Sequence, residues 1–165
     1  MAGINDGMIL FWGEGIYTNF YPVKYTYKGH TVYSSEQCYM LEKAWMFEPS
    51  KADDILATRE PMAAKRLGRK IKNYDDAKWA EVRYAKMVEV LMVKFSIPEF
   101  KKQLLATGDR MLVEASPYDR IWGVGLSEDD LRIHDPKKWR GQNLLGQALM
   151  EVRDTLRSQT GTKGE

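Results

Sequence analysis

Three short stretches near the start of the chain have the hydrophobic patterns of β-strands. Residues 8–12 (Met-Ile-Leu-Phe-Trp) form an unbroken apolar run, which predicts a buried strand. Residues 23–27 and 30–33 are rich in Thr, Tyr and Val, and Lys28-Gly29 separates them. This arrangement predicts a β-hairpin that leads directly into the next helix.

Most of the chain that follows repeats its apolar residues at helical spacing. The expected helices span residues 34–45, 48–56, 60–68, 75–95, 98–107 and 143–157, with Gly68 as a left-handed cap of the third. The remaining expectations are a frayed start at 1–7, strands at 111–115 and 121–122, a long loop at 126–142 and a polar tail at 158–165. Together they predict one mostly helical α+β domain with a small antiparallel sheet over residues 1–165, its core at about 8–156.

Composition narrows the class of protein further. The chain has 165 residues, a net charge of +2 and one cysteine, Cys38, which excludes an internal disulfide. A reducing, cytoplasmic location is therefore expected. The first residues lack the basic-then-apolar pattern of a signal peptide, and no window reaches the 18 apolar residues of a membrane span, so neither is expected. The small net charge is no nucleic-acid signature, although Lys and Arg cluster locally at 65–72 and 137–140.

The helix at 34–45 carries the first candidate chemistry. Ser34 and Gln37 form the pattern of a capping box at its start. Glu36 and Lys43 lie on one stripe of this helix, about 10 Å apart along its axis. That distance is too long for an ion pair within the helix but suits a carboxylate and an amine that flank a small ligand. The alternative is a half-buried helix with one solvated charge at each end of its stripe.

A second candidate region spans residues 112–123. Glu114 and Asp119 supply carboxylates, Trp122 can stack a base, and Gly123-Val124-Gly125 allows a backbone to approach a ligand closely. A carboxylate here can also accept hydrogen bonds from ribose hydroxyls. The alternative is an ordinary turn in which Asp119 caps its own backbone, beside a core tryptophan.

Two further positions have both a functional and a structural interpretation. Arg66 and Arg69 can bind a phosphate, or they are a solvated basic face. Asn143 can direct a helix start toward a ligand, or it is an ordinary cap. His30, His134 and Cys38 are too few and too scattered for a zinc site, so neither a metal nor another cofactor is expected.

Several of these motifs occur in an order that resembles the NADAR (YbiA-like) family. They are Phe11-Trp12-Gly13, Asn19-Phe20, Ser35-Glu36-Gln37 through Lys43-Ala44, Ala64 through Arg69, Leu112-Val113-Glu114, Asp119 through Leu126, Asp135-Pro136, Trp139, Gly141, Asn143, Leu145-Gly146 and Leu149 through Arg153. The resemblance covers residues 8–156. One departure is Thr18, where a serine is expected, and it keeps the hydroxyl group.

The resemblance implies an α+β hydrolase, an N-glycosidase that cleaves a ribose C1–nitrogen bond without a cofactor. It implies two substrate classes: ADP-ribose on guanine, in DNA or a nucleotide, and phosphoribosylamino-pyrimidine intermediates of riboflavin synthesis. ADP-ribosylated DNA is then a possible partner, whereas no membrane partner and no particular oligomeric state is implied.

We set the chemistry of this bond against the candidate residues. Lys43 is the expected nucleophile or proton-transfer amine, and Glu36 and Glu114 are the expected acid/base carboxylates. Asp119 is also counted among the expected catalytic residues, and its expected role is to hold ribose hydroxyls. The expected substrate-binding residues are Trp12, Gly13, Asn19, Arg69, Trp122, Gly123, Gly125 and Asn143. Two alternatives are a non-catalytic module that binds ADP-ribose or a nucleotide, and a nucleic-acid-binding protein that uses the basic segments.

Overall fold

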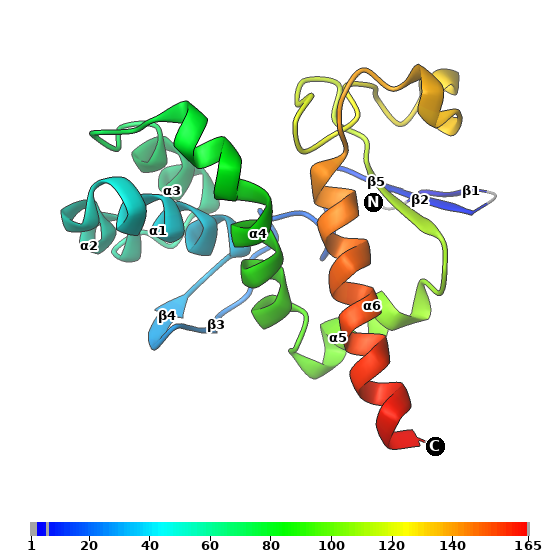
Figure 1. Cartoon of the computed structure of the whole chain (residues 1–165), viewed down its shortest axis with the longest axis horizontal. Coiled ribbons are helices and arrows are strands. Elements are labelled where there is room, and N and C mark those ends of the chain that lie inside the picture. The colour runs from blue at the N-terminus through cyan, green and yellow to red at the C-terminus, as the bar shows by residue number, and fades with distance from the viewer. Residues whose placement is uncertain (1–2, 6, 165) are drawn as a thin grey trace. The chain divides into compact units, whose positions relative to one another are not determined.

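The computed structural model of the chain describes residues 3–5 and 7–164 and divides into two compact units (Figure 1). Unit 1 combines Met1–Thr18 with Phe95–Glu165, and unit 2 is the continuous segment Asn19–Lys94. Unit 1 contains a small sheet and two helices, whereas unit 2 is mostly helical. The α+β class expected from the sequence is confirmed, and the expectation of a single domain stays a prediction.

The sheet of unit 1 has three strands in the order β1-β2-β5. Strands β1 (Gly3–Asn5) and β2 (Met8–Phe11) pair antiparallel, and β2 pairs parallel with β5 (Met111–Glu114). All four residues of β2 are buried, which accounts for its unbroken apolar run. The expectation of a frayed start is wrong for residues 3–5, because their backbone pairs with β2. The sheet is mixed rather than antiparallel as expected.

Two helices complete unit 1. Helix α5 (Pro98–Ala106) begins with the proline and is followed by Gly108, whose φ of 65° ends the turn. Helix α6 (Leu144–Gly164) runs past β5 and buries the predicted stripe of apolar residues (Figure 1). The expected polar tail after residue 157 is wrong, since α6 continues to Gly164.

The segment between β5 and α6 forms compact loops instead of the expected strand at 121–122. The carbonyls of Ile121 and Trp122 accept from the N–H groups of Leu144 and Leu145, at the start of α6. These carbonyls therefore bond to the start of α6 and are not available for pairing with a neighbouring strand. The remainder holds two short 3₁₀ helices, η2 (Leu131–His134) and η3 (Pro136–Lys138), within the loop expected at 126–142.

Unit 2 begins with the predicted hairpin, β3 (Tyr25–Tyr27) and β4 (His30–Val32). Its turn residues Lys28 and Gly29 both have positive φ, 47° and 84°, as a two-residue hairpin loop requires. The helices that follow confirm the pattern: α1 (Ser35–Phe47), η1 (Pro49–Lys51), α2 (Ala52–Leu56), α3 (Pro61–Gly68) and α4 (Asp76–Lys94). Helix α1 packs against α2, α3 and α4 and so forms the centre of this unit (Figure 1).

Gly68 has a different role from the predicted left-handed cap. It lies inside the last turn of α3 and is buried, with no positive φ. A Cβ atom at this position would overlap the Sδ atom of Met40 on α1. The glycine is therefore explained by the close approach of α3 to α1 rather than by the end of the helix.

Candidate functional site

In unit 2, the start of α1 is fixed by hydrogen bonds that the sequence predicts only in part. The Ser34 side chain accepts from the N–H of Gln37 at 3.1 Å, as expected for an N-cap. The Gln37 side chain does not bond back to the backbone N–H of Ser34, as it would in a complete capping box. Its Oε1 accepts from the N–H of Tyr33 at 2.8 Å, and its Nε2 donates to the carbonyls of Ile55 and Thr58. Helix α1 is thereby tied to the hairpin and to the end of α2.

Glu36 and Lys43 lie on the same stripe of α1 and influence each other electrostatically. Glu36 is only 7% exposed, and Lys43 is half-buried. Burial lowers the pKa of the Lys43 amine, the charge of Arg69 adds to this effect, and the carboxylates of Glu36 and Asp76 oppose it. The amine lies over the ring of Tyr74, 4.4 Å from its centroid. The structure thus brings Lys43 into the electrostatic neighbourhood of Glu36 and Arg69, all three of them predicted site residues.

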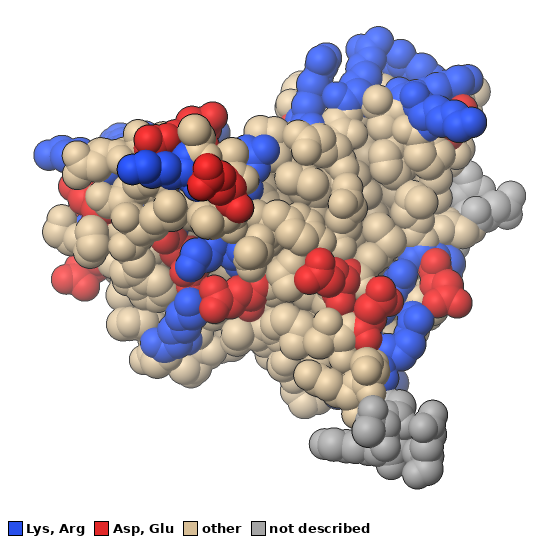
Figure 2. Space-filling view, viewed as in Figure 1, with Lys and Arg blue, Asp and Glu red and all other residues tan. Residues whose placement is uncertain are grey.

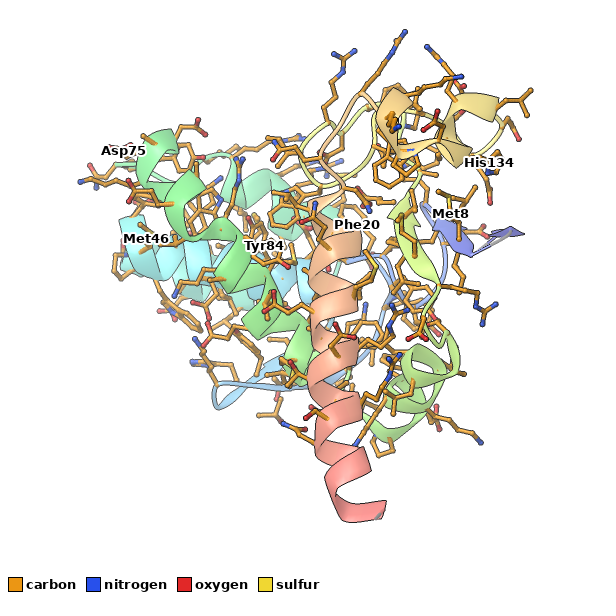
Figure 3. The ribbon with its side chains drawn as sticks, turned by 45° about the vertical axis from the view of Figure 1, so that its right-hand side comes forward. Met8, Phe20, Met46, Asp75, Tyr84 and His134 are labelled. Atoms are coloured by element: carbon orange, nitrogen blue, oxygen red, sulfur yellow. The ribbon has the colours of Figure 1, made fainter. Side chains whose placement is uncertain are left out.

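Aromatic rings line the same side of α1. Tyr39 packs against Trp79 with ring centroids 5.2 Å apart. Burial raises the pKa of the Tyr39 hydroxyl, the Glu36 carboxylate raises it further, and the Arg83 guanidinium opposes both. Asp75 caps α4 by accepting from the N–H of Lys78, and Figure 3 labels its side chain at the start of that helix. Residues from α1 and α4 therefore form one mixed aromatic and charged cluster in unit 2.

A buried polar network lies at the other end of α4. Lys94 is 0% exposed, and its Nζ donates to Ser35 Oγ at 3.4 Å. Ser35 Oγ donates in turn to Asn19 Oδ1 at 2.9 Å, and the Asn19 carbonyl accepts from the N–H of Glu36 at 2.9 Å. Burial lowers the pKa of Lys94 to about 7, although the nearby Cys38 opposes the shift. Asn19 and the backbone N–H of Glu36 thus share a hydrogen-bond network with a buried amine whose pKa is lowered by burial.

Sequence reasoning did not select Lys94, although the pattern contains a signal for it. Met87, Val90 and Leu91 lie on the buried stripe of α4, and Lys94 takes the next position on that stripe. A lysine at a core position of an amphipathic helix is unusual, because a buried ammonium is unfavourable without compensation. That anomaly is visible without a structure.

In unit 1, two of the predicted residues follow β2 directly. Trp12 is 49% exposed, and its ring lies 6.1 Å from that of Tyr118. Gly13 has φ 76°, a conformation that favours glycine.

Glu114 ends β5 and lies against the glycine loop that follows. A Cβ atom at Gly123 would come within 2.8 Å of Glu114 Oε2, so the glycine leaves room for this carboxylate. The Glu114 N–H donates to Asn143 Oδ1 at 2.9 Å, and its carbonyl accepts from the N–H of Val124 at 3.0 Å. Gly125 has φ 69°, which accounts for the second glycine of this loop.

Asp119 and Asn143 have hydrogen-bond partners within unit 1. Asp119 Oδ1 accepts from the N–H groups of Ile121 and Trp122 at 2.9 and 2.8 Å, so it caps its own turn. Asn143 is 1% exposed with φ 55°, and its Nδ2 donates to the carbonyl of Leu112 at 3.0 Å. These contacts position β5 and the loop around Trp122, which is half-buried. Whether these residues also contact a substrate stays a prediction.

The predicted residues are thus distributed over both units. Unit 2 holds Asn19, Glu36, Lys43 and Arg69, and unit 1 holds Trp12, Gly13, Glu114, Asp119, Trp122, Gly123, Gly125 and Asn143. In the described part of the chain, no three His, Cys, Asp or Glu side chains gather as a metal-binding group. Within residues 3–5 and 7–164, no helix is both long and apolar enough to cross a membrane.

The chain is an α+β protein whose helical unit places the Glu36 carboxylate and the Lys43 amine along one side of α1, with the buried Lys94 amine against Ser35 at the start of that helix. Comparison with known proteins assigns it more closely. The chain belongs to the NADAR domain family, whose model matches residues 10–157. This confirms the resemblance carried by the separated motifs.

Individual relatives agree with this assignment. The chain is 37% identical to N-glycosidase R617 of Acanthamoeba polyphaga mimivirus over 123 residues. This alignment covers 73% of this chain and 72% of that protein. It is 32% identical to the Riboflavin biosynthesis protein VVA0006 of Vibrio vulnificus over 145 residues. This alignment covers 87% of this chain and 36% of that protein. The NMR structure of the E. coli protein YbiA superposes with a TM-score of 0.77 at 27% identity, over 96% of this chain and 89% of YbiA.

Proposed function

We propose that this protein is a hydrolase that acts on N-glycosyl bonds and cleaves the bond between ribose C1 and a nitrogen. Membership of the NADAR family and the N-glycosidase names of several relatives support the reaction class. The observation that carries the proposal is the buried Glu36 of α1: its carboxylate acts electrostatically on the Lys43 amine, and its backbone N–H belongs to the hydrogen-bond network that contains Lys94.

Cleavage of a glycosidic C–N bond has two chemical requirements. Positive charge that develops at C1 must be stabilised, and the departing nitrogen must receive a proton. Glu36 is our first candidate for the acid/base carboxylate, because it is buried next to an amine. Glu114 of unit 1 is the second candidate.

An amine can serve the reaction in two ways. A protonated lysine can donate to the leaving nitrogen. A neutral lysine can attack C1 while the C1–N bond breaks and the nitrogen leaves with a proton from the acid; ring opening then gives an imine, which water hydrolyses to the free sugar and the lysine amine. Lys43 is the candidate from the sequence. Lys94 is a second candidate for the neutral amine: burial lowers its pKa to about 7, and its side chain is fully buried in the free protein. The two lysines can be separated experimentally.

For the substrate we propose an ADP-ribosyl or phosphoribosyl N-glycoside, either ADP-ribose on guanine or a phosphoribosylamino-pyrimidine. The exposed Arg69 at the end of α3 would bind phosphate, and Trp122 would stack on a ring. Asp119 Oδ2 accepts from no described residue, which leaves it for a ribose hydroxyl. The name of the Vibrio relative favours the pyrimidine class, and the name of the viral relative leaves both classes open. A single buried Cys38 supports our proposal of a reducing, cytoplasmic location.

Two assays test the proposal. The protein is incubated separately with a guanine-ADP-ribosylated oligonucleotide and with the aminopyrimidine ribose phosphate, and mass spectrometry follows loss of the ribose link. Borohydride is then added during turnover to trap an imine. An adduct lost in Lys94→Met but kept in Lys43→Met assigns the nucleophile to Lys94, and the opposite result assigns it to Lys43. Binding of ADP-ribose without turnover of either substrate would contradict the proposal and favour a non-catalytic module.

A further inference from the structure

One surface of unit 1 combines exposed aromatic rings with arginines. Tyr118 is 83% exposed and lies beside the half-exposed Trp12, as described above. Arg120 follows Tyr118 by two residues in the same loop and is also exposed. Two rings that are exposed side by side on a loop contribute little to a core, since their faces remain available to solvent or to a ligand.

Arg120 and Arg140 start from neighbouring points of this surface, although they are far apart in sequence. A Cβ atom built at Gly125 would lie 3.2 Å from Arg120 Cγ and 3.0 Å from Arg140 Cβ. Both backbones are held in place: the Arg120 carbonyl accepts from the N–H of Gln142 at 2.9 Å, and the Arg140 N–H donates to the carbonyl of Val124 at 2.9 Å. The two guanidinium groups are therefore carried by a fixed loop and not by a loose tail.

Of the five acidic residues between β5 and α6, Asp119, Asp130 and Asp135 bond within their own turns, whereas Glu128 and Asp129 are exposed. Asp119 caps its turn, and Asp135 accepts from the N–H of Lys137 at 3.0 Å. Asp130 pairs with Arg132, and the hydrogen bonds from Arg132 lower the pKa of Asp130 to about 2. These carboxylates face their own turns.

Several cations of unit 1 gather on the segment between β5 and α6. Figure 2 shows Lys and Arg side chains over the segment between β5 and α6, where Figure 1 draws η2 and η3. The exposed cations of this segment are Arg120, Arg132, Lys137, Lys138 and Arg140. Positive charge beside exposed aromatic faces is the combination that binds an unpaired nucleic-acid strand: cations contact phosphates and rings stack on bases.

We propose that this surface, formed by Trp12, Tyr118, Arg120, Arg140 and the lysines of η3, binds single-stranded nucleic acid. A duplex keeps its bases stacked inside, so it would engage the cations but not the rings. The inference deepens the proposed function and rests on it where the substrate is an oligonucleotide, because such a surface would recruit the strand; binding itself needs no ribose C1–N cleavage. It would add a binding surface for a strand to a protein whose relatives are named for small-molecule chemistry or for glycosidic bonds.

Fluorescence anisotropy tests the proposal with the full chain. The probe is a labelled oligothymidylate of about 12 nucleotides, within the site sizes of single-strand-binding surfaces. The expected results are binding at low salt, at least about fivefold weaker binding for Tyr118→Ala, recovery in Tyr118→Phe, and a similar loss for Arg120→Ala with Arg140→Ala. Contacts to about three phosphates would give a slope near −2 in log affinity against log salt.

The matched control removes two cations from another part of the same unit. Lys101→Ala with Lys102→Ala on α5 lowers the net charge equally and is expected to leave binding within about twofold. Equal losses in this control and in the arginine pair would overturn the proposal, because the effect would follow net charge alone. Unchanged binding in Tyr118→Ala, or binding of a duplex or of polyphosphate as tight as that of the strand, would also overturn it. Failure to bind the strand at low salt would overturn it while leaving the proposed hydrolase intact.

Discussion

Replacement of Lys94 by methionine tests the most unusual electrostatic feature of the molecule. The side chain is fully buried, and its pKa falls from 10.5 to about 7. At about 1.4 kcal/mol per pH unit, protonation of Lys94 costs the folded state roughly 5 kcal/mol. Because the folded pKa lies below the unfolded one, the unfolded chain binds more protons between these values. Stability therefore rises with pH over this window and is lost as the pH falls toward 7.

The accessible part of this window gives a measurable effect. Between about pH 7.5 and 9, the amine alone contributes roughly 2 kcal/mol to the rise in unfolding free energy of the wild type. Lys94→Met lacks this group, so its unfolding free energy should not rise in this way. The excess of the variant's unfolding free energy over that of the wild type should therefore shrink by the same amount as the pH rises. Urea unfolding followed by circular dichroism at three pH values would show a relative midpoint shift of about 1 M.

An exposed lysine of the same helix provides the control. Lys78→Met changes the net charge identically and removes no buried group. A free-energy difference between wild type and Lys94→Met that stays constant over the pH range would refute the reasoning. It would mean that the amine keeps an ordinary pKa despite its burial.

Three other substitutions test packing and charge in the two units. Gly68→Ala should destabilise unit 2 by about 1–3 kcal/mol in urea unfolding, because the added methyl overlaps α1. Asn143→Ala should cost about 2–4 kcal/mol in the same assay, because it removes two buried hydrogen bonds to β5. Glu42→Gln should cost about 1–2 kcal/mol at neutral pH. Burial opposes ionisation of Glu42, but hydrogen bonds from Lys28 and Tyr27 lower its pKa, so this stability should be lost as the pH falls below 4.5.

Each of these expectations has a specific check. Met40→Ala should relieve the Gly68→Ala effect, and equal losses with and without it would contradict the overlap. Asn143→Asp places a carboxylate oxygen against the buried Leu112 carbonyl, so it should destabilise at least as much as Asn143→Ala, and a smaller loss would contradict the role of the amide donor. If the difference in unfolding free energy between wild type and Glu42→Gln is the same at neutral and acid pH, the proposed role of the Glu42 charge is contradicted.

The sequence predicts elements well where local chemistry decides them. Ser34 caps α1 by a bond to its own helix, and Lys28-Gly29 adopts a turn that depends on two residues. It fails where a distant segment decides. Gly68 has the local signature of a helix end, but its role depends on Met40, twenty-eight positions earlier. Ile121 and Trp122 have strand-like side chains, but the start of α6 takes their backbone bonds.

The candidate site shows the same division. Glu36 and Lys43 can be paired from helical spacing alone, and the structure adds Arg69 and Asp76 from other elements. Lys94 is detectable only as an anomaly in an apolar stripe, since its contact with Ser35 spans fifty-nine positions. Coordinates were needed to show that Asp119 caps its own turn and that Asn143 is buried, because both residue types are common at surfaces as well as at turns.

The parallel pairing of β2 with β5 has a consequence for the order in which the chain can fold during synthesis. When the ribosome has released residues through Lys94, every residue of unit 2 is present, but β2 still lacks β5, one of its two partners in the sheet. After Lys94, about twenty more residues must be made before β5 is complete at Glu114, which takes about one to four seconds at roughly 5–20 residues per second. During these seconds the first apolar strand of the nascent chain presents an unpaired edge, which is the interval in which we expect chaperones to engage it.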